Sequence, residues 1–136
     1  YYIVEIKSLK RILDAVSRKG KPVLCFIDEV LRGTNTVERI AASSEILKNL
    51  NTDRALCFAA THDIELTSIL KDCYSNYHFQ EEVTEDEVKF DYKLYAGPAT
   101  TRNAIKLLNV IGYDKNIIKG AEQRAMHFLT DGNWKS

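Results

Sequence analysis

Val23-Leu24-Cys25-Phe26-Ile27-Asp28-Glu29 is the stretch that decides the fold expected of this chain. An apolar run of this length is typical of a strand that is buried on both faces of a parallel sheet. Pro22, directly before it, prevents a preceding helix from continuing into the run. The stretch therefore predicts a central strand whose carboxyl end carries Asp28 and Glu29.

A second apolar run at residues 55–60 ends at Thr61-His62-Asp63. Between the two runs, Asn35 is expected to cap a helix that ends near Leu50, and Glu38 completes a capping-box pattern. The expected buried stripe of this helix consists of Val37, Ile40, Ala41 and Leu47. Strand, helix and strand at this spacing predict a βαβ unit with parallel strands. Asp28, Glu29 and His62 then emerge at the carboxyl edge of the sheet, where ligands bind in open α/β folds.

The flanking segments extend this pattern. A helix before Gly20 places Ile6, Leu9, Leu13 and Val16 near one face, and a short helix after His62 runs to about Leu70. Alternating residues between 77 and 94 predict an antiparallel hairpin with an acidic turn at residues 85–87. Two helices should follow, which end at Gly112 and at Gly132. Their expected apolar stripes are Ala104, Leu107, Leu108 and Ile111 in the first, and Ile117, Ile118, Ala121, Ala125, Phe128 and Leu129 in the second, which Asp114 caps.

Composition narrows the class of protein. Nineteen basic and nineteen acidic residues balance, which argues against a strongly basic nucleic-acid module. The three cysteines match no short metal-binding spacing and favour the cytoplasm as the compartment. No apolar stretch is long enough to span a membrane. The chain does not begin with methionine and opens in an apolar pattern, which we interpret as an excised part of a longer protein.

The acids and the histidine suit nucleotide chemistry. A bound nucleoside triphosphate carries Mg²⁺, and Asp28 at a rigid strand end can hold this metal directly or through a water. Glu29 can activate the attacking water, and His62 can donate to the terminal phosphate. Each residue also has a structural alternative: two acids after a strand can simply be solvated or cap a turn, and a histidine can pack at a strand–helix junction.

Two segments resemble the ATPase domain of the MutS mismatch-repair family. Residues 23–36, which end in Arg32-Gly33-Thr34-Asn35-Thr36, resemble its Walker B strand and following loop. Residues 58–67, with Ala60-Thr61-His62, resemble its sensor-histidine segment. The opening residues 1–6 resemble the family's signature helix, in which Glu5 matches a glutamate with an expected structural role.

The resemblance implies a fold, a set of sites and a domain division. The fold is α/β, the C-terminal portion of an ABC-class P-loop NTPase domain: residues 1–100 form part of that domain, and 101–136 are a helical pair within it. Asp28 matches the Mg²⁺-linked aspartate, and Glu29 and His62 match catalytic residues. Gly33, Thr34, Asn35 and Thr36 match the nucleotide-contacting loop. ATP and Mg²⁺ are the implied cofactors of the full-length protein, with a homodimer formed through the ATPase domain and DNA bound by domains outside this chain.

Departures from the family pattern indicate a divergent branch. Leu31 stands where the family has glycine, Asn35 where it has serine, and Thr101-Arg102-Asn103 where it has Ser-Tyr-Gly. No G-x-x-x-x-G-K-[ST] phosphate loop occurs in the sequence, so the chain alone is expected to be inactive. Two other interpretations stay open: a dimerisation or scaffold module, and another ABC-class ATPase not involved in mismatch recognition.

Overall fold

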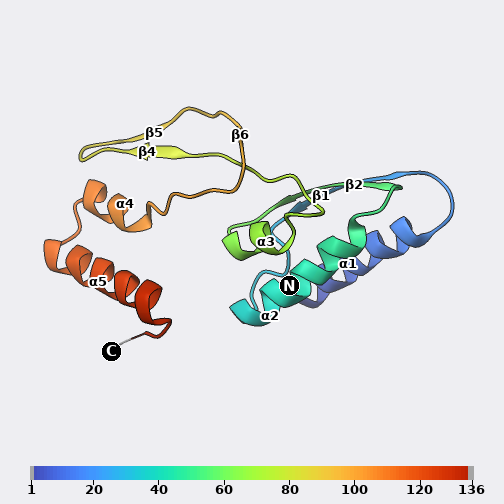
Figure 1. The fold of residues 1–136 in the computed structure, drawn as a ribbon, viewed down its shortest axis with the longest axis horizontal. Helices are drawn as coiled ribbons and strands as arrows, with labels where there is room; N and C mark the ends of the chain where they lie inside the picture. The colour runs from blue at the N-terminus through green and yellow to red at the C-terminus, as the bar shows by residue number, and fades with distance from the viewer. Residues whose placement is uncertain (1, 135–136) are drawn as a thin grey trace. The chain divides into compact units, whose positions relative to one another are not determined.

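A computed structural model of the chain describes residues 2–134 (Figure 1). Tyr1, which belongs to the proposed signature helix, lies outside the described residues, as do residues 135–136. The chain divides into two compact units, Tyr1–Asn76 and Tyr77–Ser136. The hairpin and the helical pair 101–136 therefore belong to one unit, and the predicted βαβ segment belongs to the other.

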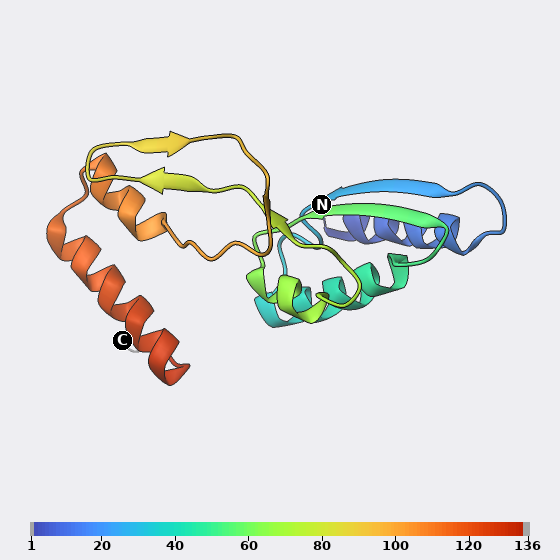
Figure 2. The ribbon, with the colours of Figure 1, turned by 45° about the horizontal axis from the view of Figure 1, so that its top comes forward.

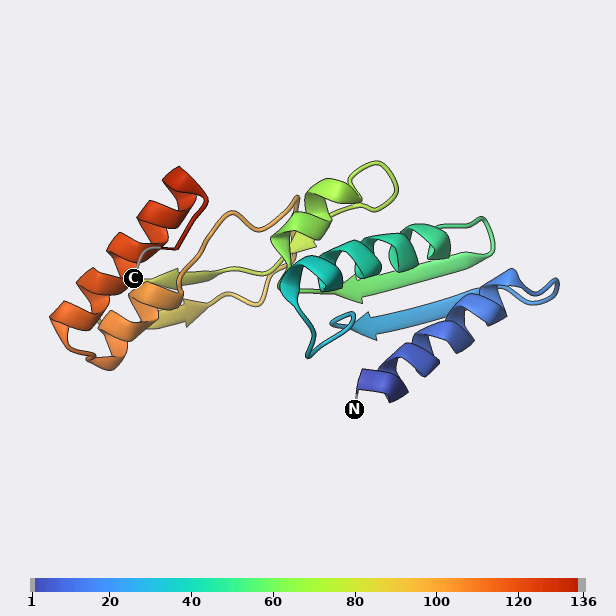
Figure 3. The same cartoon turned by 90° about the horizontal axis from the view of Figure 1, so that it is seen from below.

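The first unit is a parallel βαβ unit with an additional helix at each end. Its elements are α1 (Tyr2–Ser17), β1 (Val23–Asp28), α2 (Thr36–Leu50), β2 (Ala55–Ala60) and α3 (Ile64–Ile69). Strands β1 and β2 pair in parallel, with Val23 opposite Ala55 and Asp28 opposite Ala60 (Figure 3). The strand order and direction predicted from the two apolar runs are thus confirmed.

The core of this unit lies between the sheet and its helices. Figure 2 shows α1, α2 and α3 on one side of the two strands. Cys25 and Ile27 of β1 point into this layer, where they join buried leucines from all three helices. All of the buried hydrophobic side chains among the described residues lie in this unit: Leu9, Val16, Cys25, Ile27, Val30, Leu31, Leu47, Leu50, Leu66 and Leu70.

The opposite face of the sheet is open within this unit, so the expectation that both strands are buried on both faces was wrong for the unit by itself. Leu24 and Phe26 of β1 are 59% and 71% exposed, and Leu56 and Phe58 of β2 are 59% and 53% exposed. The rings of Phe26 and Phe58 stack with centroids 5.3 Å apart. Side chains alternate across a strand, so helices on one side can bury only every second residue. We call these four residues the open sheet face.

Helix α2 begins as predicted, but its buried stripe differs. The Asn35 side chain accepts hydrogen bonds from the amides of Val37 and Glu38, which confirms it as the N-cap. Val37 is 76% exposed and Ala41 is also exposed, so both were wrongly assigned to the stripe. Its buried positions are Ser43, Ser44, Leu47 and Leu50. The helical phase is set by Leu47 and Leu50, and the small serines allow close approach: Ser43 donates to the Val30 carbonyl.

The second unit contains the predicted hairpin and helical pair. Strands β4 (Glu81–Val83) and β5 (Val88–Phe90) are antiparallel, and β3 (Tyr77–His78) pairs in the same sense with β6 (Tyr95–Ala96). Helices α4 (Ala104–Ile111) and α5 (Lys115–Asp131) end at left-handed Gly112 and Gly132, as expected.

The apolar stripes of these two helices are shallower than predicted. Among their described residues none is fully buried, and Ala104, Ile111, Ile117 and Leu129 are exposed. The half-buried apolar positions are Ile105, Leu107, Leu108, Val110, Ile118, Ala121, Ala125 and Phe128. The buried polar residue of the unit is Asn103, whose amide donates to the Glu81 carboxylate at 3.0 Å and ties the start of α4 to the hairpin.

Candidate functional site

Three residues predicted to act together meet at the carboxyl ends of β1 and β2. The parallel pairing places Asp28 beside Ala60, and the Glu29 amide donates to the Ala60 carbonyl at 2.9 Å. Two residues beyond Ala60, His62 Nε2 lies 3.2 Å from Glu29 Oε1. The structure therefore joins the carboxylate and the imidazole that the sequence placed at one sheet edge.

The three side chains differ in exposure. The Glu29 side chain is 29% exposed, whereas those of Asp28 and His62 are 86% and 93% exposed. Asp28 and His62 are thus open to a ligand, and Glu29 lies partly shielded beside them. A carboxylate in contact with an imidazole, and next in sequence to a second acid, has the groups needed to accept a proton from water near a metal-bound phosphate.

Arg32 is a member of the site to which the sequence analysis assigned no role. Its Nε lies 2.5 Å from Glu29 Oε2, and its terminal nitrogen lies 3.4 Å from Asp28 Oδ2. One guanidinium therefore contacts both acids and offsets their mutual repulsion. The sequence signal for this role is that Arg32 follows Glu29 by three residues and Asp28 by four. A tight turn after a strand brings a residue at this spacing back to the strand end.

The loop after β1 holds an unusual backbone. Glu29 and Leu31 have φ values of 57° and 60°, in the left-handed region that is costly for residues other than glycine. The Leu31 side chain is only 3% exposed, within the core. This geometry explains both the glycine of the family pattern and its replacement here: the position needs a positive φ, and leucine compensates for the strain by burial.

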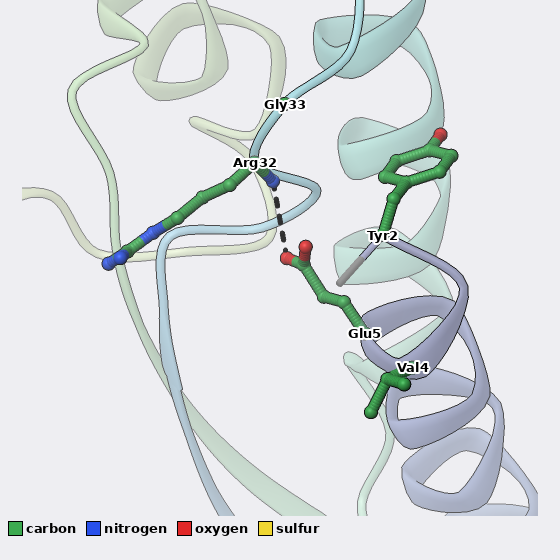
Figure 4. A pocket seen from close by; sticks show the side chains of 5 residues that line it. All are labelled: Tyr2, Val4, Glu5, Arg32 and Gly33. Atoms are coloured by element: carbon green, nitrogen blue, oxygen red, sulfur yellow. Dashed lines mark hydrogen bonds between the residues drawn. The ribbon is translucent and has the colours of Figure 1, made fainter.

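Glu5 of α1 anchors this loop. Its Oε1 accepts hydrogen bonds from the amides of Leu31 at 2.5 Å and Arg32 at 3.3 Å. Figure 4 shows the Glu5 carboxylate directed at the Arg32 backbone, while the guanidinium extends away from it. The structural role expected of Glu5 is confirmed.

Two open cavities flank Glu5. One of about 430 Å³ is lined by residues of α1 and β1, and it includes Asp28, Glu29 and Arg32. The other, of about 790 Å³, is lined by Tyr2, Val4, Glu5, Arg32 and Gly33 (Figure 4). The acids of the site therefore border a hollow surface.

The other predicted nucleotide-contacting residues lie on the connection to α2. Gly33 has a φ of 84° and lines the larger cavity, and Thr34 is half-buried. The Asn35 side chain is engaged as the helix cap, and Thr36 is the exposed first residue of α2. Their contact with a nucleotide stays a prediction.

A second ion pair lies next to the site. Arg39 of α2 binds Asp63 through two hydrogen bonds, Nε to Oδ2 at 2.7 Å and Nη2 to Oδ1 at 2.5 Å. The bond with Asp63 is the main cause that raises the pKa of Arg39 above its usual value, and the charge of Glu29 contributes in the same direction. This pair was not predicted from the sequence, because 24 residues separate its members and no local pattern relates them.

The described residues contain neither a ready-made cluster of metal ligands nor a membrane-spanning helix. Within residues 2–134, no group of three or more His, Cys, Asp or Glu side chains is arranged to hold a metal ion. In the same range, no helix combines the length and apolar character needed to cross a membrane.

Comparison with known proteins places the chain in a family. The family model described as MutS domain V matches residues 1–129. The chain belongs to the MutS family. It is 31% identical over 125 residues to the DNA mismatch repair protein MutS of Natronomonas pharaonis, covering 90% of this chain and 14% of that protein. It is 27% identical over 133 residues to DNA mismatch repair protein MutS 2 of Haloarcula marismortui, covering 96% of this chain and 13% of that protein.

A MutS protein of Aquifex pyrophilus is 29% identical over 125 residues, with 90% of this chain and 14% of that protein covered. The chain thus spans about one-seventh of the length of these MutS relatives. The resemblance stated from residues 23–36 and 58–67 is confirmed at the level of the family, and the mixed α/β structure is consistent with MutS domain V.

Proposed function

We propose that this chain supplies the Walker B acids and the sensor histidine of an ABC-class P-loop ATPase site in a full-length MutS-type protein. ATP hydrolysis there drives a DNA-linked conformational change in mismatch repair or a related DNA transaction. The observation that carries the proposal is the 3.2 Å approach of His62 Nε2 to Glu29 Oε1 at the ends of two parallel strands. Proteins named for DNA mismatch repair match nearly the whole chain, which supports it.

The donor set fits Mg²⁺ delivered with a nucleotide. Asp28 is an exposed carboxylate at a strand end, and no ready-made cluster of ligands surrounds it in the described part of the chain. Mg²⁺ usually keeps several waters and binds one or two carboxylates together with substrate phosphates. Asp28 would hold the metal directly or through a water, and the metal would neutralise charge on the phosphates.

The remaining residues have complementary roles in this proposal. Glu29 takes the proton of the attacking water on its carboxylate, and Arg32 and His62 on either side orient that carboxylate. The exposed His62 donates to the terminal phosphate. Gly33, Thr34, Asn35 and Thr36 contact the nucleotide. The phosphate-binding loop must come from elsewhere in the protein, because this sequence holds no G-x-x-x-x-G-K-[ST].

A scaffold role is the second candidate, and a specific observation favours it. Parallel sheets are almost always covered on both faces, yet the open sheet face is apolar and more than half exposed. We propose that parts of the ATPase domain outside this chain cover this face, and that the apolar stripes of the helical pair 101–136 support a homodimer. DNA would bind through domains outside this chain, and the protein would act in the cytoplasm.

The direct test is Glu29→Gln in the full-length protein. This change removes the base and keeps the shape, so turnover of ATP should fall about a hundredfold or more while nucleotide binding is retained. His62→Ala should also slow turnover, with a smaller effect on binding. Turnover of the glutamine variant within about twofold of the unmodified protein would exclude Glu29 as the base. An unmodified full-length protein that neither binds nor hydrolyses ATP would favour the scaffold role.

A further inference from the structure

His62 is placed by its backbone and not by packing. Its side chain is 93% exposed, so core contacts do not select its rotamer. Among the residues that the structure describes, the polar contact of the His62 imidazole is with the Glu29 carboxylate. The position of the imidazole must therefore depend on what holds the loop at residues 61–63.

That loop is held by Asp63. Asp63 occupies the N-cap position of α3, yet its side chain makes no capping hydrogen bond. Both carboxylate oxygens instead receive Arg39, and the Asp63 amide donates to Thr61 Oγ1 at 3.0 Å. Acidic residues at this position normally cap the helix. Here the Asp63 carboxylate instead contacts Arg39 of α2. Thr61 and Asp63, on the two sides of His62, are both held by hydrogen bonds.

Arg39 connects this loop to the other half of the site. It lies in the first turn of α2. This helix is capped by Asn35 and follows the loop that begins at Glu29. The side chains of Arg39 and Asp63 are 25% and 14% exposed, and the guanidinium fork binds both oxygens of one carboxylate. Two-point pairs of this kind fix orientation as well as distance. The pair thus joins the first turn of α2, which follows the loop of Glu29, to the loop that carries His62.

We propose that Arg39 and Asp63 form a positioning pair that sets His62 beside Glu29. Neither residue touches the reacting atoms; the pair acts through the backbone of residues 61–63. Its effect on turnover rests on the proposed ATPase function, whereas its effect on the loop does not.

The test uses the full-length protein without nucleotide and measures amide hydrogen exchange. Arg39→Met and Asp63→Asn should each speed exchange in residues 61–66 about tenfold to a hundredfold, the factor that corresponds to loss of charge-assisted hydrogen bonds. Exchange in β1 should stay unchanged. The double variant should be no faster than either single one, because both remove the same interaction. Arg39→Lys keeps the charge without the fork and should give a smaller increase.

Lys10→Met provides a matched control. It removes an exposed ion pair with Asp14 on α1, whose side chains are 70% and 45% exposed, and it should leave exchange and turnover unchanged.

In steady-state ATPase assays, Arg39→Met should lower kcat about tenfold to a hundredfold with little change in KM, because His62 would no longer be held in its working position. Adding His62→Ala to Arg39→Met should then lower kcat no further.

Each outcome bears on the proposal separately from the ATPase function. Unchanged exchange at residues 61–66 in both single variants, or additive effects in the double variant, would overturn the positioning pair. Faster exchange in a protein that hydrolyses no ATP would support the pair and refute the proposed function. A further loss of turnover on removing His62 from Arg39→Met would show that Arg39 acts elsewhere and would also overturn the proposal.

Discussion

Leu31 offers a test of the strained loop, because the usual advantage of alanine over glycine should not hold at this position. Leu31 is 3% exposed and has a φ of 60°. Leu47 is equally buried at 3% but lies within helix α2. We compare alanine with glycine at both positions. The two leucines differ in backbone conformation and match in burial.

Removing either side chain should lower the free energy of unfolding by about 2–5 kcal/mol, the range for Leu→Ala in a core. Glycine in a helix interior is about 1 kcal/mol worse than alanine, so Leu47→Gly should be less stable than Leu47→Ala. At position 31, glycine relieves a left-handed conformation that costs other residues about 1–2 kcal/mol. Its greater freedom in the unfolded state offsets about 0.5–1 kcal/mol of this gain.

The loss of the last methyl group is common to both positions and cancels. The glycine-minus-alanine difference should therefore be about 1–2.5 kcal/mol more favourable at position 31 than at position 47. Urea denaturation of the four variants, followed by far-ultraviolet circular dichroism, measures this difference. If glycine is worse than alanine by the same amount at both positions, Leu31 is not held in a strained conformation and the explanation given for its departure from the family pattern fails.

Three further predictions concern the chain itself. Burial, followed by a hydrogen bond with Cys57, raises the pKa of the Cys25 thiol to about 12, and burial also raises the pKa of Tyr74. The folded state favours both protonated forms, so the stability that these two groups contribute should be complete below pH 9 and be lost as the pH rises from 9 toward 12. Equilibrium denaturation across this range checks it, and Cys25→Ala should flatten the decline. The isolated chain should not bind Mg-ATP, since it lacks the phosphate loop, and micromolar binding in calorimetry would contradict this. The isolated chain should form a dimer through the edge of β2 that pairs with no other strand among the described residues, through its terminal helices, or through the open sheet face. Sedimentation equilibrium giving a single 15.5 kDa species at tens of micromolar would count against it.

The order of elements in this protein is a property of its sequence. Helix starts at Asn35 and Asp114 and ends at Gly112 and Gly132 were predictable, because capping side chains and left-handed glycines act over a few residues. The parallel pairing of β1 and β2 followed from the length and apolar character of two runs. Asp28, Glu29 and His62 could be placed at one edge for the same reason, since parallel strands end on the same side.

The tertiary structure decided what covers these elements and which side chains meet. The apolar runs at 23–27 and 55–60 suggested burial on both faces, but an apolar sequence records only a preference for burial, and the cover over the open sheet face does not come from this unit. The contact of Arg39 with Asp63 spans 24 residues, so it depends on how α2 packs beside α3 and has no periodic signature. The positive φ of Leu31 likewise follows from Glu5, 26 residues earlier in the chain, which binds the loop, and from the core that receives the leucine. Local hydrogen bonds and periodicity thus set the elements, whereas long-range packing sets the geometry of the site.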